Sequence, residues 1–441
     1  MNSSVLEELE WRGFLHQITD EEVDELLADD EVTLYCGFDP TAESLQVGNL
    51  LPIMMLAHFR RHGHNPIALV GGATGLIGDP SGKTEERTLM TDEELEANLD
   101  GISAQIDRVL DRAGEIHPET MGAEPDEVDE GGVPLLNNAD WTREKTFIEF
   151  LRDVGKYFRV NQMINKESVR ARLEEREHGI SYTEFSYMVL QANDFLHLFE
   201  KQDCKLQVGG SDQWGNITAG TDLVRRKLGE TVYGITAPLL TTSSGQKLGK
   251  TADGTVWLDP ERTSPYEFYQ YFVRRQDEEV PELLKMFTFL PREEVDELIG
   301  TIEAGDNRGE VQKKLAWEVT ALVHGADEAD FSVRASDILY GETIEDMTDA
   351  QLSKIFADVP STEVERDRLT GEGVGIRELF VETELQNSRG AAKRLIKQGG
   401  AYLNNEEVDD VRTQVTTDDL ASETMLVLRS GKRNYHVVKV V

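Results

Sequence analysis

The stretch Pro66-Ile-Ala-Leu-Val-Gly-Gly-Ala-Thr-Gly-Leu-Ile-Gly-Asp-Pro-Ser-Gly-Lys83 joins a short apolar run to a glycine-rich segment. Such an apolar run is typical of a buried strand, and the glycines after it permit the tight turn that leads from a strand into a helix. Two further stretches follow the same order: Val32 to Phe38 and Leu206 to Val208 have the pattern of buried strands, and each runs into a turn. Three such units predict an α/β fold with a doubly wound parallel sheet, whose ligands bind outside the carboxyl ends of the strands.

The composition excludes several classes of protein. The 441 residues include 45 Lys and Arg against 84 Asp and Glu, a formal net charge of −39. This charge argues against a general nucleic-acid binder and against attachment to anionic membranes, because both partners attract basic patches. The longest apolar run, Leu50 to Ala57, is too short to cross a bilayer, and the first residues lack the features of a secretory signal. Cys36 and Cys204 alone cannot form a zinc site. We therefore expect a soluble, cytoplasmic protein without a tightly bound metal.

The acidic excess is spread along the chain and is densest at residues 123–132. We hypothesise that the host is a halophile with a salty cytoplasm, where screening reduces the repulsion between like charges and the excess charge keeps the protein in solution. Unfolding measured against potassium chloride concentration tests this hypothesis. Equal stability in dilute buffer and in molar salt would contradict it.

The pattern changes near residue 264. Ser264-Pro265-Tyr-Glu267 combines an N-cap serine, a proline at the first helical position and a glutamate three residues after the cap, which predicts a helix start. The residues that follow have helical character as far as about 339, and 340–373 have the composition of a polar connector. We therefore predict four segments: a doubly wound domain at 1–262, an α-helical domain at 263–345, a linker at 346–373 and a small α+β domain at 374–441.

The last segment differs from the rest in charge. Residues 374–441 contain ten basic and ten acidic residues, so residues 1–373 carry the whole net charge of −39. Arg389, Lys393 and Lys397 are spaced by four residues and therefore lie on one face of a predicted helix. Three charges on a helix are often only a solvated face. In a chain otherwise so acidic, we interpret them as an RNA-binding face.

Three patterns in the first 262 residues suggest a site for a small polar molecule and phosphates. Residues 77–84 resemble a phosphate-binding P-loop, but Ile77 stands where that motif requires glycine, so they indicate only a ligand-binding turn. Tyr187, Gln191 and Asp194 have the spacing of one helical stripe, suited to a zwitterion; a plain exposed stripe is the alternative. Ser243 to Thr251 holds two lysines that could close over phosphates, or could form only a hinge.

Four long strings give the chain a family resemblance: Leu34 to Ala42, Ala68 to Lys83, Val208 to Gly220 and Lys247 to Thr251. With these strings in this order, the chain resembles the bacterial-type tyrosyl-tRNA synthetases, which are class I aminoacyl-tRNA synthetases. The resemblance extends over essentially the whole length. It implies a Rossmann-like catalytic domain that includes the lysine loop, an α-helical anticodon-recognition domain, a small RNA-binding domain and a homodimer.

The resemblance also implies a two-step reaction. L-tyrosine and Mg-ATP form tyrosyl-adenylate and pyrophosphate, and the tyrosyl group then passes to the 3′ end of tRNA(Tyr). Because the attacking carboxylate is already an anion and pyrophosphate leaves readily, catalysis requires positioning and charge stabilisation more than an acid–base pair. Mg²⁺ would enter with ATP.

The residues that match the family's tyrosine pocket carry complementary chemistry. Tyr35 and Asp194 would bond the substrate phenol, and Asp79, Tyr187 and Gln191 would hold its ammonium group. The pocket would also be lined by Thr74 and Gln213. Phenylalanine would leave buried polar groups unpaired, and tyrosyl enzymes are the standard example of discrimination by this means.

Two further sets match positions at which the family handles ATP. ATP would be bound by Gly37, Asp39, Gly48, Gly210, Asp212 and Lys250. The pentavalent phosphate and pyrophosphate would be stabilised by Thr41, Gln46, Asn49, Lys83, Arg87, Lys247, Lys250 and Thr251.

One string departs from the family pattern. Class I enzymes carry His-Ile-Gly-His where this chain has Gln46-Val-Gly-Asn49. Both amides keep an N–H donor for phosphate or ribose oxygens but cannot become cations. Because the lysine loop and Thr41 remain, we expect an active enzyme. A tryptophanyl enzyme is one alternative, which the phenol-reading pair Tyr35 and Asp194 opposes. A non-catalytic RNA-binding scaffold is the other.

Overall fold

The computed structural model describes residues 4–81, 90–122, 132–166, 169–170, 180–243, 245, 248–251, 254–307, 309–357 and 359–441, without the side chains of Lys250 and Thr251. The chain divides into two compact units, Met1–Ala329 and Asp330–Val441. Among the residues just given, no helix is both long and apolar enough to span a membrane.

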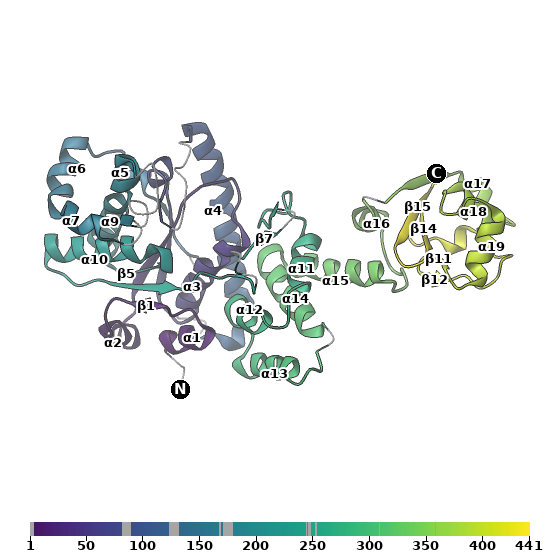
Figure 1. Ribbon diagram of the computed structural model, residues 1–441, viewed down its shortest axis with the longest axis horizontal. Coiled ribbons are helices and arrows are strands. Elements are labelled where there is room, and N and C mark those ends of the chain that lie inside the picture. The colour runs from purple at the N-terminus through teal and green to yellow at the C-terminus, as the bar shows by residue number, and fades with distance from the viewer. Residues whose placement is uncertain are drawn as a thin grey trace. The chain divides into compact units, whose positions relative to one another are not determined.

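The first unit is built on a six-stranded sheet with the order β1-β6-β5-β2-β3-β4 (Figure 1). The strands are β1 Gln17–Ile18, β2 Thr33–Phe38, β3 Asn65–Val70, β4 Leu135–Asn137, β5 Cys204–Gly210 and β6 Tyr233–Ala237. Strands β2 to β6 run parallel, as the sequence predicted, and only the short edge strand β1 is antiparallel. The chain moves from β2 to β3 on one side and reaches β5 on the other. The order therefore reverses beside β2, and a ligand crevice is expected where that reversal occurs.

Helices flank this sheet. They are α1 Val5–Arg12, α2 Glu22–Asp29, α3 Leu50–Arg61, α4 Asp92–Glu115, α5 Ala139–Thr142, α6 Phe147–Asp153, α7 Val160–Ile164, α9 Tyr182–Gln202 and α10 Trp214–Leu228. Short 3-10 turns are η1 Val47–Asn49, η2 Thr74–Leu76, η3 Pro118–Thr120, η5 Gly155–Tyr157 and η6 Ser211–Gln213. Helix α9 begins where the Ser181 side chain accepts a hydrogen bond from the Glu184 N–H. Its apolar face joins the core that contains Tyr35 and Phe195, whose rings meet edge to face at 5.4 Å between centroids.

A helical region follows the sheet. After the hairpin β7 Lys250–Thr251 and β8 Gly254–Thr255 come α11 Pro265–Val273, α12 Val280–Phe287, α13 Arg292–Glu303, α14 Glu310–His324 and α15 Ala326–Tyr340. Helix α11 begins with the predicted capping box, in which the Ser264 and Glu267 side chains each accept the other's backbone N–H. Helices α11 to α14 lie in the same compact unit as the sheet.

The second unit contains a five-stranded sheet with the order β12-β11-β14-β15-β9 and a two-stranded pair, β10 and β13. Its strands are β9 Ser361–Val364, β10 Val374–Gly375, β11 Ala401–Leu403, β12 Glu406–Glu407, β13 Gln414–Val415, β14 Met425–Ser430 and β15 Asn434–Val440. Its helices besides α15 are α16 Asp349–Ile355, α17 Arg366–Leu369, α18 Ile376–Glu382 and α19 Arg389–Lys397.

The prediction that residues 346–373 form a polar connector is wrong. Helix α16 lies within this segment, and β9 pairs in parallel with β15 at the edge of the five-stranded sheet. Only Val364 of β9 is buried, because an edge strand with one covered face needs few apolar residues. The polar composition of β9 therefore resembles that of a loop when only the sequence is known. The boundaries at 262 and 345 stay predictions.

Candidate functional site

A cavity of about 380 Å³ opens at the carboxyl ends of β2, β3 and β5. Most of the site residues predicted from the sequence line it together: Tyr35, Gly37, Asp39, Thr41, Gln46, Gly48, Asn49, Thr74, Asp79, Tyr187, Gln191, Asp194, Gly210, Asp212 and Gln213. Lys83, Arg87 and Lys247 lie outside the described residues, as do the side chains of Lys250 and Thr251. Segments far apart in the sequence therefore converge on one polar chamber.

Asp194 is held deep in this cavity by two donors. Its Oδ2 accepts a hydrogen bond from Asn138 Nδ2 at 2.9 Å, and its Oδ1 accepts one from Trp141 Nε1 at 2.8 Å. Burial raises the pKa of the Asp194 carboxyl to about 7, although both hydrogen bonds lower it. Tyr35 also lines the cavity, and its buried hydroxyl has no hydrogen-bond partner among the described residues. A buried acceptor and an unpaired hydroxyl suit a ligand that carries its own hydroxyl.

Asn138 and Trp141 were missed in the sequence analysis. Asn138 follows β4 directly, and Trp141 lies in the short helix α5. The Asn138 side chain also donates to Thr74 Oγ1 at 3.0 Å and accepts from the Ala73 N–H at 2.7 Å. An asparagine at the carboxyl end of a strand was the available signal, but β4 has three residues and no distinct apolar pattern.

A second group of side chains centres on Asp39. Tyr187 donates its hydroxyl hydrogen to Asp39 Oδ2 at 2.8 Å, and Thr74 Oγ1 donates to Asp39 Oδ1 at 2.8 Å. Burial, followed by the charges of Asp39 and Asp79, raises the pKa of the Tyr187 phenol well above its usual value, so this phenol stays neutral. Gly71 packs so closely that a side chain there would meet both Asp39 and Thr74. The network therefore joins Asp39, which we expect to bind ATP, with Thr74 and Tyr187, which we expect to bind tyrosine.

A third group centres on Asp79. Gly78 has a φ of +82°, a conformation that glycine adopts readily, and presents Asp79 after the turn. Asp79 Oδ2 accepts a hydrogen bond from Gln213 Nε2 at 2.6 Å, and Gln213 Oε1 accepts one from Gln191 Nε2 at 3.2 Å. Gln191 Oε1 has no partner among the described side chains and backbone. A carboxylate and an unpaired amide oxygen suit a cationic group.

The string Gln46 to Asn49 lies on a different wall of the cavity. The Gln46 N–H donates to Asn49 Oδ1 at 2.9 Å, so the asparagine oxygen is used within the string. Helix α3 starts immediately afterwards at Leu50, and a helix N-terminus favours negative charge. Gly210 ends β5, and Asp212 lies in η6 between β5 and α10. This part of the cavity therefore offers backbone and amide donors for phosphate oxygens.

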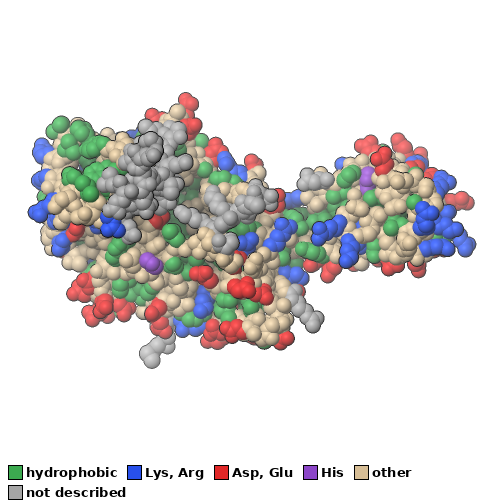
Figure 2. Space-filling model, viewed as in Figure 1, with side chains coloured by type: hydrophobic (Ala, Val, Ile, Leu, Met, Phe, Trp, Pro, Cys, Tyr) green, Lys and Arg blue, Asp and Glu red, His purple; other side chains and the backbone are tan. Residues whose placement is uncertain are grey.

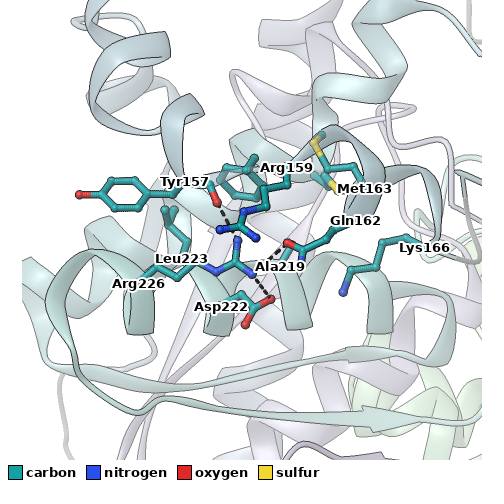
Figure 3. A pocket seen from close by; sticks show the side chains of 11 residues that line it. Tyr157, Arg159, Gln162, Met163, Lys166, Ala219, Asp222, Leu223 and Arg226 are labelled. Carbon is teal, nitrogen blue, oxygen red and sulfur yellow. Dashed lines mark hydrogen bonds and ion pairs between the residues drawn. The ribbon is translucent and has the colours of Figure 1, made fainter.

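A smaller cavity, of about 30 Å³, lies between α7, η5 and α10 (Figure 3). Arg226 lies at its centre and donates to the Tyr157 carbonyl at 2.7 Å and to Gln162 Oε1 at 3.0 Å, and it pairs with Asp222 at 3.4 Å. A space of this size can hold a water molecule or two but is too small for a substrate. Arg226 instead fastens η5 and α7 to α10.

The three predicted RNA-binding cations lie in the second unit. Arg389, Lys393 and Lys397 are exposed along α19, and Figure 2 shows basic side chains gathered at that end of the unit. Arg389 forms an ion pair with Glu378 at 2.5 Å. A basic helical face is therefore present in an otherwise acidic chain.

Comparisons with known proteins place this chain in a family. Residues 27–340 match the family described as tRNA synthetases class I (W and Y), and residues 351–438 match the Tyrosine–tRNA ligase SYY-like C-terminal domain. The tyrosine–tRNA ligase of Rhodopirellula baltica is 52% identical over 99% of this chain and 97% of its own length. That of Opitutus terrae is 48% identical over 99% and 100%.

Solved structures agree with these relatives. A C-terminally truncated mitochondrial tyrosyl-tRNA synthetase of Aspergillus nidulans is 34% identical, with a TM-score of 0.69 over 76% of this chain and 94% of its own. A tryptophanyl-tRNA synthetase of Encephalitozoon cuniculi shares the fold at 14% identity and a TM-score of 0.51, over 73% and 86%. The chain belongs to the tyrosine–tRNA ligases, within the class I tRNA synthetases.

Proposed function

We propose that the cavity at the carboxyl ends of β2, β3 and β5 is where this tyrosine–tRNA ligase joins L-tyrosine to ATP before transfer to tRNA(Tyr). The observation that carries this proposal is the buried pair of Asp194 and Tyr35, whose hydroxyl has no partner among the residues that the structure describes. The substrate phenol would donate its hydrogen to the Asp194 carboxylate and accept one from Tyr35. Phenylalanine would leave both groups unpaired, which is costly in a buried site.

The ammonium group of tyrosine would bind beside Asp79. A charge of opposite sign is supplied by the Asp79 carboxylate, and the unpaired Gln191 oxygen can accept a hydrogen bond from the ammonium group. The Tyr187 hydroxyl donates to Asp39, so its oxygen remains able to accept as well. Gln213 and Thr74 would fix these groups in place. With phenol and ammonium held at separate points, the substrate carboxylate has a defined direction.

The ATP part of the cavity follows from its backbone. Gly37, Gly48 and Gly210 would allow nucleotide atoms close to the chain, and Asp39 and Asp212 would accept hydrogen bonds from ribose or ammonium donors. The carboxylate of tyrosine would attack the α-phosphorus, a P–O bond to pyrophosphate would break, and no proton would move. Thr41, Gln46 and Asn49 can donate to phosphate oxygens beside the N-terminus of α3.

The lining explains why lysines from elsewhere are needed. Its charged residues are the carboxylates Asp39, Asp79, Asp194 and Asp212, and no Lys or Arg is among the described residues that line it. ATP adds further negative charge. We therefore assign charge compensation to the Mg²⁺ that accompanies ATP and to the predicted cations Lys83, Arg87, Lys247 and Lys250, with Thr251 as a donor.

Charging of tRNA(Tyr) tests the proposal. With ATP and labelled tyrosine, the chain should form acid-precipitable tyrosyl-tRNA, and tryptophan should not replace tyrosine. The exposed face of α19 would contact the tRNA, so Lys393→Ala should raise the KM for tRNA and leave that for tyrosine unchanged. Charging with tryptophan, or none with tyrosine, would contradict the assignment.

A homodimer forms part of this proposal. An apolar surface covers α6 and α7, where Phe147 and Ile148 are 66% and 68% exposed and Val160 is 59% exposed. Figure 2 shows hydrophobic side chains gathered over α6. Arg226 on α10 donates a hydrogen bond to Gln162 on α7, so α7 is attached to a long helix of the same unit. Exposed apolar groups of this extent favour association, and a second copy of the chain is the occupant that the family resemblance implies.

The change Ile148→Glu should convert a dimer into a monomer. A charge in the middle of a dry interface is unpaired and costly to bury. Sedimentation equilibrium of the wild type and the variant measures the mass directly. Tyr340→Glu is the matched control, because Tyr340 is 76% exposed on α15 and should leave the mass unchanged. A monomeric wild type, or a dimeric Ile148→Glu variant, would contradict the proposed interface.

A further inference from the structure

The lysine loop, residues 243–251, is attached to the helical region at two described points. Near its start, the Ser243 N–H and hydroxyl both donate to Glu279 Oε1, at 2.8 and 3.0 Å. Near its end, the Gly249 N–H donates to the Tyr271 hydroxyl oxygen at 3.0 Å. Tyr271 lies on α11 and Glu279 immediately before α12, so neither belongs to the sheet.

Arg275 connects these two attachment points. Its guanidinium carbon lies 4.1 Å from the centre of the Tyr271 ring, and its NH1 atom lies 3.6 Å from Glu279 Oε2. Its Nε also donates to the Tyr271 carbonyl at 2.9 Å. Burial raises the pKa of the Glu279 carboxyl, but the hydrogen bonds from Ser243 and the Arg275 charge outweigh it, so the net pKa is lowered and the group stays ionised. The three side chains therefore form one connected clamp.

The clamp has its own support. Gln312 on α14 is buried and donates to Asp277 Oδ1 at 2.6 Å and to the Arg275 carbonyl at 3.4 Å. Asn307 donates to the same Asp277 oxygen at 3.0 Å. The backbone that carries Arg275 is thus fixed from the side opposite the loop.

On its other side, Gly249 lies against the Gln46 to Asn49 string. A Cβ on Gly249 would lie 3.3 Å from Val47 Cβ and 3.5 Å from the Gly48 nitrogen. The Val256 N–H donates to the Gly249 carbonyl at 2.9 Å, and the Val47 N–H donates to the Val256 carbonyl at 3.1 Å. Gly249 is therefore held between the clamp and the wall of the cavity, and β7, with Lys250, follows directly.

We propose that Tyr271, Arg275 and Glu279 are positioning residues for adenylate formation, because they fix the backbone on which Lys250 approaches the phosphates. This inference rests on the proposed role of the lysine loop. None of the three clamp residues lines the cavity, so their loss should slow the chemical step without weakening tyrosine binding. Figure 1 shows β7 beside α11, which is the junction that the clamp spans.

Tyrosine-dependent exchange of pyrophosphate into ATP, measured on the full chain, tests this. Tyr271→Phe keeps the ring under Arg275 and removes only the acceptor of the Gly249 N–H. We expect kcat to fall at least tenfold, with the Kd for tyrosine within twofold of the wild type. Glu279→Ala should act in the same direction, and Glu279→Gln should recover most of the activity because it keeps an oxygen for Ser243.

The control is Tyr233→Phe, which removes an exposed hydroxyl on β6 that donates to Glu22 on α2 and should leave kcat unchanged. A kcat for Tyr271→Phe within twofold of the wild type would overturn the inference. So would an equal loss of kcat and of tyrosine affinity, which indicates general damage. Absence of exchange by the wild type would contradict the proposed function, whereas normal exchange by Tyr271→Phe would contradict only the role of the clamp.

Discussion

Replacing Asp194 with asparagine is expected to lower kcat/KM for tyrosine roughly a thousandfold. The two Asp194 oxygens accept hydrogen bonds from Asn138 and Trp141, and asparagine offers only one such oxygen. One buried donor would then face an NH₂ group, and the substrate phenol would lose a charged acceptor. Together these losses amount to about 4 kcal/mol. Steady-state kinetics of tyrosine activation measure the effect.

The control for this variant is Asp140→Asn, which removes a carboxylate from an exposed position on α5 beside Trp141. It should leave kcat/KM within twofold. A similarly small effect of Asp194→Asn would show that the phenol is recognised elsewhere in the cavity.

The raised pKa of Asp194 also predicts how stability depends on pH. The folded protein keeps this proton up to about pH 7, whereas the unfolded chain releases it near the ordinary value of 3.8. Between these values the folded state binds more protons, so the contribution to stability present at low pH is lost as the pH rises through the interval. The free energy of unfolding of the wild type, relative to Asp194→Asn, should therefore fall by up to about 1.4 kcal/mol per pH unit and level off above about pH 7. A flat difference would contradict the raised pKa.

Replacing Tyr35 with phenylalanine should stabilise the free protein and weaken its selectivity. The Tyr35 hydroxyl is buried without a partner in the described part of the chain, and relief from this desolvation is worth about 1–2 kcal/mol. The same change removes a hydrogen bond that only tyrosine can make. The ratio of kcat/KM for tyrosine to that for phenylalanine should fall about tenfold to a hundredfold.

Thermal unfolding and activation kinetics with both amino acids check the two halves of this prediction. Tyr233→Phe serves again as the control, because its hydroxyl lies near the surface and bonds Glu22. An unchanged selectivity ratio together with lower stability would indicate that Tyr35 is simply a core residue.

The core of the sheet and the polar stripe of Tyr187, Gln191 and Asp194 were predictable because each leaves a local signal. Strands β2 and β3 are buried on both faces and are largely apolar, and glycines follow β3 and end β5. Helix α9 carries its polar stripe at helical spacing beside a buried face. These features depend only on neighbours in the sequence.

Other features depend on distant partners and left no such signal. Strand β1 has two residues, both exposed, and gains its place only by pairing with β6. Asn138 reaches Asp194 across the cavity after a three-residue strand. Tyr271 on α11 and Glu279 just before α12 belong to no motif in the sequence, and their proposed role follows from their hydrogen bonds to the lysine loop. Tertiary packing, rather than local pattern, assembles these parts of the site.

The most direct test of the account is amino-acid-dependent exchange of labelled pyrophosphate into ATP, without tRNA. It isolates the first step, and it does not depend on the binding of tRNA. Tyrosine should support exchange, phenylalanine and tryptophan should not, and Asp194→Asn should abolish most of the tyrosine signal while the protein stays folded. Exchange with tryptophan alone, or no exchange with tyrosine by a folded wild type, would contradict the account.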